Sequence, residues 1–472
     1  MLTPENIDEI CRWEIDAFAE KNANYIYFDS ERISGIKSGR YFLVVGRKGT
    51  GKTAICRFLL NDQAINSTSS CVTYLTYNDC IMPFVERIRA IGYDFTSMLR
   101  CQVYWKLIIY SSVLVQSKFK TIWAKHKIMK AIMYALFPDI SDKKIEVKVQ
   151  AGLNTGIFKF GVDITTAKNK ENWNIDRIVS FIETYYASHI SEFKDNYVLF
   201  DRLDYEYIGT VESHDDRRQY LNLLNSLISV CYDINQGIAT TWKLNCVVFL
   251  REDIYAMIKN DDKDKWGNKK IDLVWSLLAM ENLLKHRLVT ALHGYDANNV
   301  FQQVFAQNVS FGSICRCTQL RPRDLIQYMI LLADNLKTLG KNLIEKGHVK
   351  YVQSNYAGKL FESLEIEAAN GEYYSEISAI LRNLHRLPKK TSEYSDITGF
   401  SVEDFMACFP EQCTSEEIAY NLIGELFKYN FIGQIFPSFA LYIYMRDSKS
   451  RFTTEKRDMY CIHYGLLEYV YK

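Results

Sequence analysis

The stretch Gly46-Arg47-Lys48-Gly49-Thr50-Gly51-Lys52-Thr53 fits the pattern G-x-x-x-x-G-K-[ST] at every fixed position. The apolar residues 41–45 precede it directly and are typical of a strand buried on both faces of a parallel sheet. Residues 52–60 predict a helix that begins inside the motif. A glycine-rich loop between a buried strand and a helix is the setting in which this pattern binds phosphate. The stretch therefore predicts a nucleotide-binding α/β domain.

The chemistry of the loop assigns roles to its polar groups. Glycines let backbone N–H groups converge on phosphate oxygens, and the N-terminus of the following helix adds the positive end of its dipole. Lys52 would bring its charge to the β- and γ-phosphates of ATP, and Thr53 would offer its hydroxyl to Mg²⁺. The residues predicted to contact the nucleotide are Gly46, Arg47, Lys48, Gly49, Thr50, Gly51, Lys52, Thr53 and Ala54.

A second strand pattern ends in a carboxylate. Residues 198–200 are apolar and Asp201 follows them, with Asp204 three residues later. Asp201 is predicted to hold Mg²⁺, directly or through water. Asp204 is predicted to orient or deprotonate the attacking water. For both residues the alternative is an Asp that caps the turn after the strand.

The order of the predicted strands narrows the fold class. Residues 71–77 predict a strand between the loop strand and the Asp201 strand along the sequence. This order suits the division of P-loop proteins that has an additional strand between the two motif strands, which includes AAA+ and STAND ATPases. Strands that alternate with helices predict a mostly parallel α/β sheet.

Two further cationic positions are candidates for sensing the nucleotide. Arg251 ends a predicted fourth strand, where a polar side chain would sense the γ-phosphate. Its alternative is a surface arginine paired with a neighbouring carboxylate. Arg323 or Arg321 would reach the nucleotide from a helix that Pro322 opens, and a purely structural turn is the alternative there. Lys52, Asp201, Asp204 and Arg251 are the predicted catalytic residues.

The pattern along the chain predicts four parts. Helices are expected over 5–20, 83–136, 174–193 and 214–234, then nearly throughout 275–368. The last hundred residues predict a helix over 416–429 and two strands over 440–445 and 459–463, which is the winged-helix order. The predicted divisions are an N-terminal helix and lead-in over 1–40, a P-loop ATPase core over 41–300 with a β-hairpin insert near 145–166, a helical lid over 301–370, and a winged-helix-like domain over 371–472.

Composition limits the partner classes. The chain has 472 residues and a net charge of +1, so no overall attraction to DNA or membranes is expected. No signal peptide and no transmembrane run are recognised, and twelve cysteines mostly inside apolar patterns indicate a reducing compartment, the cytoplasm. Cys315 and Cys317 lack the second pair that a zinc site needs. The basic run 118–130 predicts a solvated helix with one buried face, with nucleic-acid contact as its alternative.

Taken together, these residues resemble a bacterial P-loop ATPase family related to STAND and origin-recognition AAA+ proteins, often encoded near phage-defence genes. The resemblance spans about residues 25–470 and is carried by the motifs at 46–55, 198–204, 248–255 and 320–326, by Trp275 with Arg287, and by Asn-Phe-Ile-Gly at 430–433. It implies ATP and Mg²⁺ as cofactors. One departure is Arg202, which stands where AAA+ proteins usually have a catalytic Glu, so fast turnover by that route is not expected.

Three functions from different classes follow. The first, which we favour, is an ATPase switch in antiviral defence: ATP binds between sheet and lid, slow hydrolysis resets the state, and subunits or a partner effector assemble. The second is an origin-recognition-like DNA-binding ATPase. The third is a nucleotide-binding scaffold with little hydrolysis. Residues 446–458 carry five cations and three anions, a small excess for a DNA-reading surface, so the C-terminal domain is expected to contact mainly protein.

Overall fold

The structure, a computed structural model, describes residues 1–20, 30–62, 72–76, 97–136, 175–189, 196–204, 214–237, 244–260, 263–292, 296, 298–369, 371, 373–392, 395–436, 441–443, 452–455 and 458–471. The chain forms two compact units. The first comprises Met1–Tyr27, Lys48–Gly51 and Val274–Lys472, and the second comprises Phe28–Arg47 and Lys52–Leu273. No helix within the described residues is both long and apolar enough to cross a membrane. The hairpin predicted near 145–166 lies outside the described residues.

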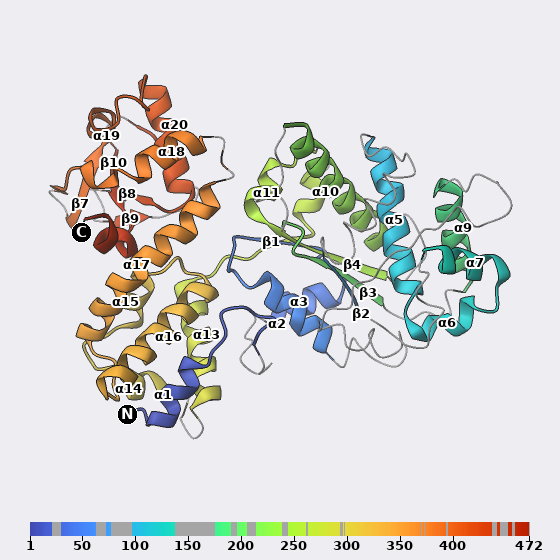
Figure 1. Cartoon of the computed structure of the whole chain (residues 1–472), viewed down its shortest axis with the longest axis horizontal. Coiled ribbons are helices and arrows are strands. Elements are labelled where there is room, and N and C mark those ends of the chain that lie inside the picture. The colour runs from blue at the N-terminus through green and yellow to red at the C-terminus, as the bar shows by residue number, and fades with distance from the viewer. Residues whose placement is uncertain are drawn as a thin grey trace. The chain divides into compact units, whose positions relative to one another are not determined.

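A five-stranded parallel sheet forms the centre of the second unit, in the order β2-β3-β4-β1-β5 (Figure 1). Strand β4 thus lies between the loop strand β1 and the Asp201 strand β3, which confirms the predicted α/β P-loop fold with an additional strand. Parallel strands end at a common edge, and there Gly46 pairs with Arg251 and Thr76 with Asp201. The strands are β1 Leu43–Gly46, β2 Val72–Thr76, β3 Asn196–Asp201, β4 Leu244–Arg251 and β5 Lys270–Asp272.

Helices cover both faces of this sheet because its strands are apolar on both sides. Val44 faces α2 and α3, where it packs with Ile36 and Ile55. Its neighbours Leu43 and Val45 face the opposite core, which α5 and α10 supply. The helices on these faces are α2 Ser30–Lys37, α3 Lys52–Asn61, α5 Met98–Leu114, α9 Ile175–Ser188 and α10 His214–Asn235, and α11 Glu252–Met257 and α12 Lys263–Gly267 follow β4.

The segment before α9 differs from its prediction. The part of the predicted helix 83–136 that the structure describes is broken into α5, α6 Ser117–Trp123 and α7 Lys127–Leu136. Trp123 explains the first break, because its indole Nε1 donates to the carbonyl of Leu114 at 2.8 Å and closes the turn between α5 and α6. The side chain of His126 accepts a hydrogen bond from the N–H of Met129 and begins α7.

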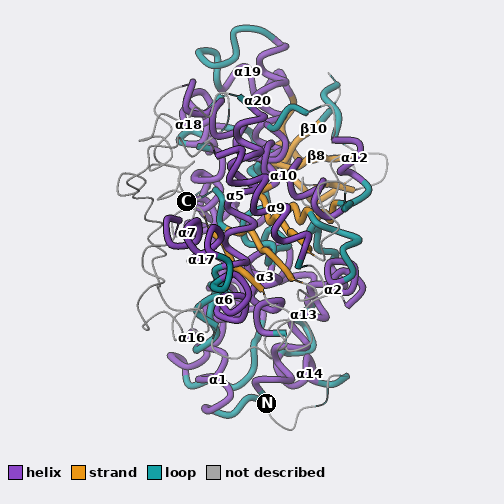
Figure 2. Tube along the Cα trace, turned by 90° about the vertical axis from the view of Figure 1, so that its right-hand side faces the viewer, coloured by secondary structure: helices purple, strands orange, loops and turns teal. Residues whose placement is uncertain are grey.

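The first unit begins with α1 Pro4–Cys11, which packs against α16 (Figures 1 and 2). The helix predicted over 5–20 is therefore too long. Beyond α1 the chain turns so that Trp13 lies over the guanidinium of Arg287 at 4.9 Å, and Arg287 pairs with buried Glu20 at 2.6 Å. The helical prediction for 275–368 is confirmed by α13 Leu277–Ala291, α14 Val300–Val304, α15 Phe311–Arg316, α16 Pro322–Leu339 and α17 Lys346–Ala368.

In the C-terminal part of the first unit, α20, β9 and β10 correspond to the predicted helix and two strands, but the sheet is larger, and β6 and β7 precede α19 and α20. Five antiparallel strands follow the order β6-β7-β10-β8-β9, so β8 and β10 are central. Aromatic side chains of this part contact α17, where the ring of Phe361 lies 4.7 Å from Tyr469 and 5.7 Å from Phe431. The elements are α18 Tyr374–Leu381, η7 Leu384–Arg386, β6 Lys390–Ser392, β7 Ser395–Ser401, α19 Val402–Cys408, α20 Glu416–Lys428, β8 Ile432–Phe436, β9 Leu441–Ile443, β10 Met459–Ile462, η9 Tyr464–Leu466 and α21 Leu467–Val470.

Candidate functional site

Two glycines give the loop after β1 its shape. Gly49 and Gly51 have φ of +84° and +96°, which side-chain-bearing residues rarely adopt. A Cβ on Gly49 would also lie 3.1 Å from the Cβ of Arg323, so the backbone of these two residues approaches closely. The loop geometry thus favours glycine at Gly51, which the phosphate-binding pattern fixes, and also at Gly49, which the pattern leaves open.

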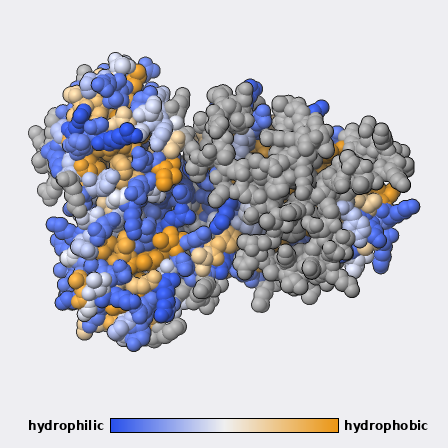
Figure 3. Space-filling model, in the orientation of Figure 1, coloured by the Kyte–Doolittle hydropathy of each residue, from blue (hydrophilic) through white to orange (hydrophobic). Residues whose placement is uncertain are grey.

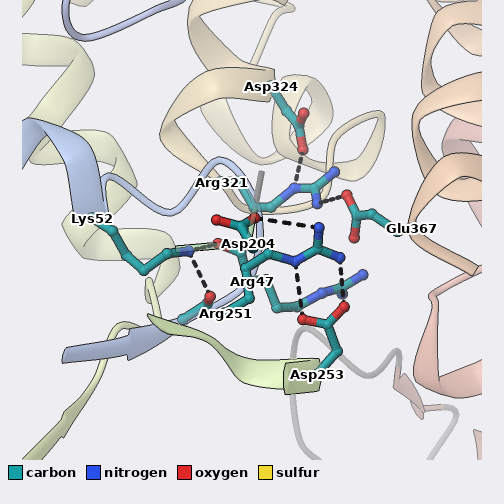
Figure 4. Close-up of polar contacts among 9 residues, drawn as sticks. Arg47, Lys52, Asp204, Arg251, Asp253, Arg321, Asp324 and Glu367 are labelled. Carbon is teal, nitrogen blue, oxygen red and sulfur yellow. Dashed lines mark hydrogen bonds and ion pairs between the residues drawn. The ribbon is translucent and has the colours of Figure 1, made fainter. Parts of the chain in front are cut away.

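Lys52 begins α3 and turns back onto the loop (Figure 4). Its Nζ donates hydrogen bonds to the carbonyls of Gly46 at 2.7 Å and Arg47 at 3.0 Å. Burial lowers the pKa of Lys52 to about 8, although Asp204 and Asp201 act to raise it. The carbonyls of Gly46 and Arg47 thus hold the ammonium at the start of the loop, and phosphate oxygens could replace them as its acceptors.

Asp201 ends β3 and is only 2% exposed. The hydroxyl of Thr53 and the N–H of Arg202 donate to its carboxylate, and burial raises its pKa. Its Oδ2 is buried without a hydrogen-bond partner. A buried carboxylate oxygen usually has a partner, so this atom marks a place for one. A hard cation with few protein ligands, such as Mg²⁺, fits the pair Asp201 and Thr53, because Mg²⁺ usually keeps waters and adds substrate phosphates.

Asp204 and Arg251 meet beside this pair. Arg251 ends β4, is 4% exposed, and its Nη1 lies 3.5 Å from Oδ2 of Asp204. The same guanidinium forms a two-pronged contact with Asp253, at 3.0 Å through Nε and 2.5 Å through Nη2 (Figure 4). The surface pairing that was the alternative for Arg251 is thus partly realised, but with a buried arginine.

Within the first unit, Trp275 and Arg323 donate hydrogen bonds to the loop segment Lys48–Gly51. The indole Nε1 of Trp275 donates to the carbonyl of Thr50 at 2.9 Å. The backbone N–H of Arg323 donates to the carbonyl of Gly49 at 3.3 Å. Both bonds engage carbonyls of the loop and so help to fix its conformation. Arg323 lies in the first turn of α16, and its side chain is partly exposed.

Arg321, the other arginine of this motif, is enclosed by two carboxylates (Figure 4). Its Nε donates to Asp324 at 2.7 Å and its Nη1 to Glu367 at 2.5 Å. All three side chains are at most 6% exposed. Burial disfavours the charge on Arg321, but the two carboxylates outweigh burial and raise its pKa. Leu320, which precedes it, has a φ of +50° that turns the chain into α16.

The structure brings most of the predicted residues together in two sets. Lys52, Thr53, Asp201, Asp204 and Arg251 gather at the carboxyl edge of the sheet in the second unit. Ala54 lies in the first turn of α3, and Arg323 accompanies residues 48–51 in the first unit.

Three contacts around these residues were missed from sequence. The indole N–H of Trp275 that reaches Thr50 gives no signal in a hydrophobicity pattern. Glu367 and Glu20 pair with arginines 46 and 267 residues away, so no local spacing could have found them.

Comparisons with known proteins add the following. Residues 278–365 match a family model described as the FunZ-associated C-terminal helical domain. No curated protein matches the chain. The ORC2 protein of Aeropyrum pernix, solved as ADPNP-ADP complexes, is similar over 91% of this chain and 86% of its own, at 9% identity and a TM-score of 0.37. Cdc6p from Pyrobaculum aerophilum is similar over 98% and 95%, at 10% identity and a TM-score of 0.34.

Proposed function

We propose that this chain is an ATP-binding, slowly ATP-hydrolysing molecular switch whose nucleotide state controls its assembly with itself or with a partner effector. The observation that carries the proposal is the unpaired Oδ2 of Asp201, which lies beside the Thr53 hydroxyl at the end of the Lys52 loop. A complete phosphate-binding loop and an orphaned buried carboxylate oxygen at one sheet edge support a site for a nucleotide with its metal.

Binding is proposed to use the loop as follows. The N–H groups of residues 48–53 and the N-terminus of α3 receive the phosphates. The Lys52 ammonium exchanges its bonds to the Gly46 and Arg47 carbonyls for phosphate oxygens. Thr53 and Asp201 would hold Mg²⁺, which neutralises phosphate charge when bound.

We expect hydrolysis to be slow because of the residues that surround the position of the attacking water. Arg202 stands at the position of the usual catalytic Glu, and its side chain is exposed. Asp204 is the remaining carboxylate that could orient or deprotonate water, but it contacts the Arg251 guanidinium at 3.5 Å. While it makes this contact, its Oδ2 is engaged by the guanidinium and is less available to a water molecule. Arg251 itself is proposed to sense the γ-phosphate by leaving this contact.

The switch is proposed to run through α16. Arg323 lies against Gly49 of the loop, to which its backbone N–H donates, and a phosphate on the loop would attract its side chain. The neighbouring Arg321 ties the start of α16 to Glu367 on α17. Helix α17 in turn packs on Tyr469 and Phe431 of the C-terminal part. A nucleotide-dependent movement of Arg323 would therefore be transmitted to the C-terminal domain, which we propose contacts protein.

The setting we propose is the cytoplasm, in antiviral defence. Ten described cysteines are free thiols, which supports a reducing compartment. The defence role is supported by the family resemblance of the motifs. A second copy of the chain or an effector protein is the proposed partner.

The test is the mass of the full chain, measured without nucleotide and with ATP, ADP or duplex DNA, together with phosphate release. We expect ATP to increase the mass and ADP to reverse it, with turnover below the 1 s⁻¹ that is about the lower end for typical enzymes. Arg323→Ala should bind ATP without the mass change, and Arg382→Ala, an exposed arginine at the end of α18, should behave as wild type.

Three results would contradict the switch. ATP binding with no mass change and no phosphate release would favour the scaffold. A mass increase that requires DNA would favour the origin-recognition-like alternative. No binding of ATP would remove the nucleotide site altogether.

A further inference from the structure

The stretch that contains helices α5 to α7 carries basic side chains but no acidic ones. Residues 97–136 contain seven Lys or Arg and no Asp or Glu, in a chain whose total charge is +1. At the average composition of this chain, 40 residues would carry about five acidic side chains. Charge segregated in this way marks a local electrostatic footprint even where the net charge of the protein is near zero.

Four of these seven cations fall into two groups. Lys106 of α5 is used internally, because its ammonium pairs with Glu183 of α9 at 3.2 Å. Lys125, Lys127 and Lys130 are exposed, and no described carboxylate pairs with them. Lys130 lies over the ring of Tyr134 at 5.6 Å, which holds its stem against the helix. We call Lys125, Lys127 and Lys130 the basic face.

The basic face stands on a fixed support. Trp123 and Met129 are fully buried beneath it, and Trp123 stacks edge-on with Tyr134 at 6.0 Å. His126, between the two helices, lies 5.2 Å from the ring of Tyr185 on α9. Lys127 and Lys130 are three residues apart on one helix, so they point to the same side. The described surface at this end of the unit shows hydrophilic residues beside one small hydrophobic patch (Figure 3).

The geometry points to a partner: we propose that the basic face binds the phosphate backbone of double-stranded DNA, without reading its sequence. Lysines on a fixed helix suit phosphates, which carry no sequence information. A membrane surface would require an exposed apolar helix face. The apolar face of α7, formed by Met129, Ile132 and Met133, is instead buried, and Ile128 alone is a large exposed apolar residue there, at 52%.

Single strands are a poorer match than a duplex. Proteins that bind single-stranded nucleic acids stack bases on exposed aromatic rings. The aromatic residues of α6 and α7 are turned inward: Phe119 and Trp123 are at most 2% exposed, and Tyr134 is half-buried under Lys130. The basic face thus offers charge without stacking. It is separate from the nucleotide site, so this inference does not depend on ATP binding.

The experiment is a titration of the full chain against a fluorescently labelled 30-bp duplex of arbitrary sequence, at 50 to 200 mM salt. We expect Lys125→Gln/Lys127→Gln/Lys130→Gln to weaken binding by about tenfold or more and to reduce the salt slope by about 2 to 3, because each lost phosphate contact removes about 0.9. The same positions changed to Arg should retain binding.

A matched control carries the same loss of charge elsewhere. Lys341, Lys346 and Lys350 are exposed lysines of the first unit, and their triple Gln variant should bind DNA as wild type does. Equal weakening by both triple variants would overturn the proposal, because charge alone would then explain it. It would also be overturned if the wild type fails to bind the duplex at 50 mM salt, or binds single strands, duplex RNA or anionic phosphatidylserine vesicles as tightly as duplex DNA.

Discussion

Arg321 and Arg251 are both buried arginines that contact two carboxylates, and sequence makes both candidates for sensing the nucleotide. Their surroundings differ. Arg321 in the first unit pairs with Asp324 and Glu367, whose side chains are each 6% exposed. Arg251 in the second unit pairs with Asp204 and Asp253, which are 28% and 24% exposed. The Arg321 cluster, which we call the dry cluster, is almost completely excluded from solvent. The Arg251 cluster, which we call the open cluster, has two carboxylates that are partly exposed to solvent.

This difference separates an arginine that holds structure from one that can respond. Removing one member of a desolvated cluster leaves uncompensated buried charge, so Arg321 is committed to joining α16 to α17. Partly hydrated carboxylates lose less when their arginine leaves, since water replaces it. Arg251 can therefore change partners when a charged ligand arrives. We therefore propose Arg323 as the cation of the Arg-Pro-Arg motif that would contact a nucleotide.

The largest expected effect tests the dry cluster. Arg321→Met should destabilise the packing of α16 on α17 by about 3–5 kcal/mol, because Asp324 and Glu367 would remain buried without their cation. Arg251→Met should cost less than about 2 kcal/mol in its own unit, because its partners are partly hydrated. Hydrogen exchange of peptides from α16, α17 and β4 measures both. Comparable losses of protection at the two sites would remove the distinction.

A second prediction sharpens the role of the open cluster. Asp201→Asn should lower ATP turnover by about 100-fold or more, because the oxygen assigned to the metal would lose its charge. Asp204→Asn should have a smaller effect, since Asp204 is already shared with Arg251. Single-turnover phosphate release at saturating Mg²⁺ and ATP compares them. If Asp204→Asn proves more damaging, Asp204 and not Asp201 holds the metal, and the two roles are reversed.

The sheet and the loop could be predicted because their signals are local. The four strands predicted from apolar runs correspond to β1, β2, β3 and β4, and the loop motif lies directly after β1. Strand β5 was missed because it is three residues long and reads Lys-Ile-Asp. The contacts that decide the roles of the two arginines are harder to foresee. Glu367 lies 46 residues from Arg321, and only folding makes them neighbours.

A third prediction concerns a residue whose role its sequence did not reveal. Trp275→Phe keeps the aromatic packing but removes the Nε1 donor to the Thr50 carbonyl. A hydrogen bond of this kind contributes about 0.5–1.5 kcal/mol, so ATP affinity should fall by about two- to tenfold as the loop loosens. Calorimetric titration measures the affinity. Trp266→Phe, a fully buried tryptophan of the second unit, is the control that should leave it unchanged.

The smallest expected effect is a pH dependence of ATP binding. Burial lowers the pKa of Lys52 to about 8, so the free protein loses this charge as the pH rises through that value. Phosphates would raise the pKa again, so binding above pH 8 requires uptake of a proton. Affinity should be constant below about pH 7 and about fourfold weaker at pH 8.5. Lys52→Arg stays charged, so its ATP affinity should not change with pH over this range. An equal decline of affinity in both proteins would show that Lys52 does not cause the pH dependence.

The most direct test of the account is the affinity for ATP with Mg²⁺, measured by calorimetry for the wild type and for Lys52→Ala. Lys52 makes its two hydrogen bonds to its own loop, so the variant should keep the wild-type melting temperature. Loss of a hydrogen bond from a charged group costs about 1.5–3 kcal/mol, which predicts ATP binding weakened by about 10- to 150-fold and turnover abolished. Unchanged affinity and unchanged turnover in a folded Lys52→Ala protein would contradict the assignment of a nucleotide-binding loop to residues 46–53.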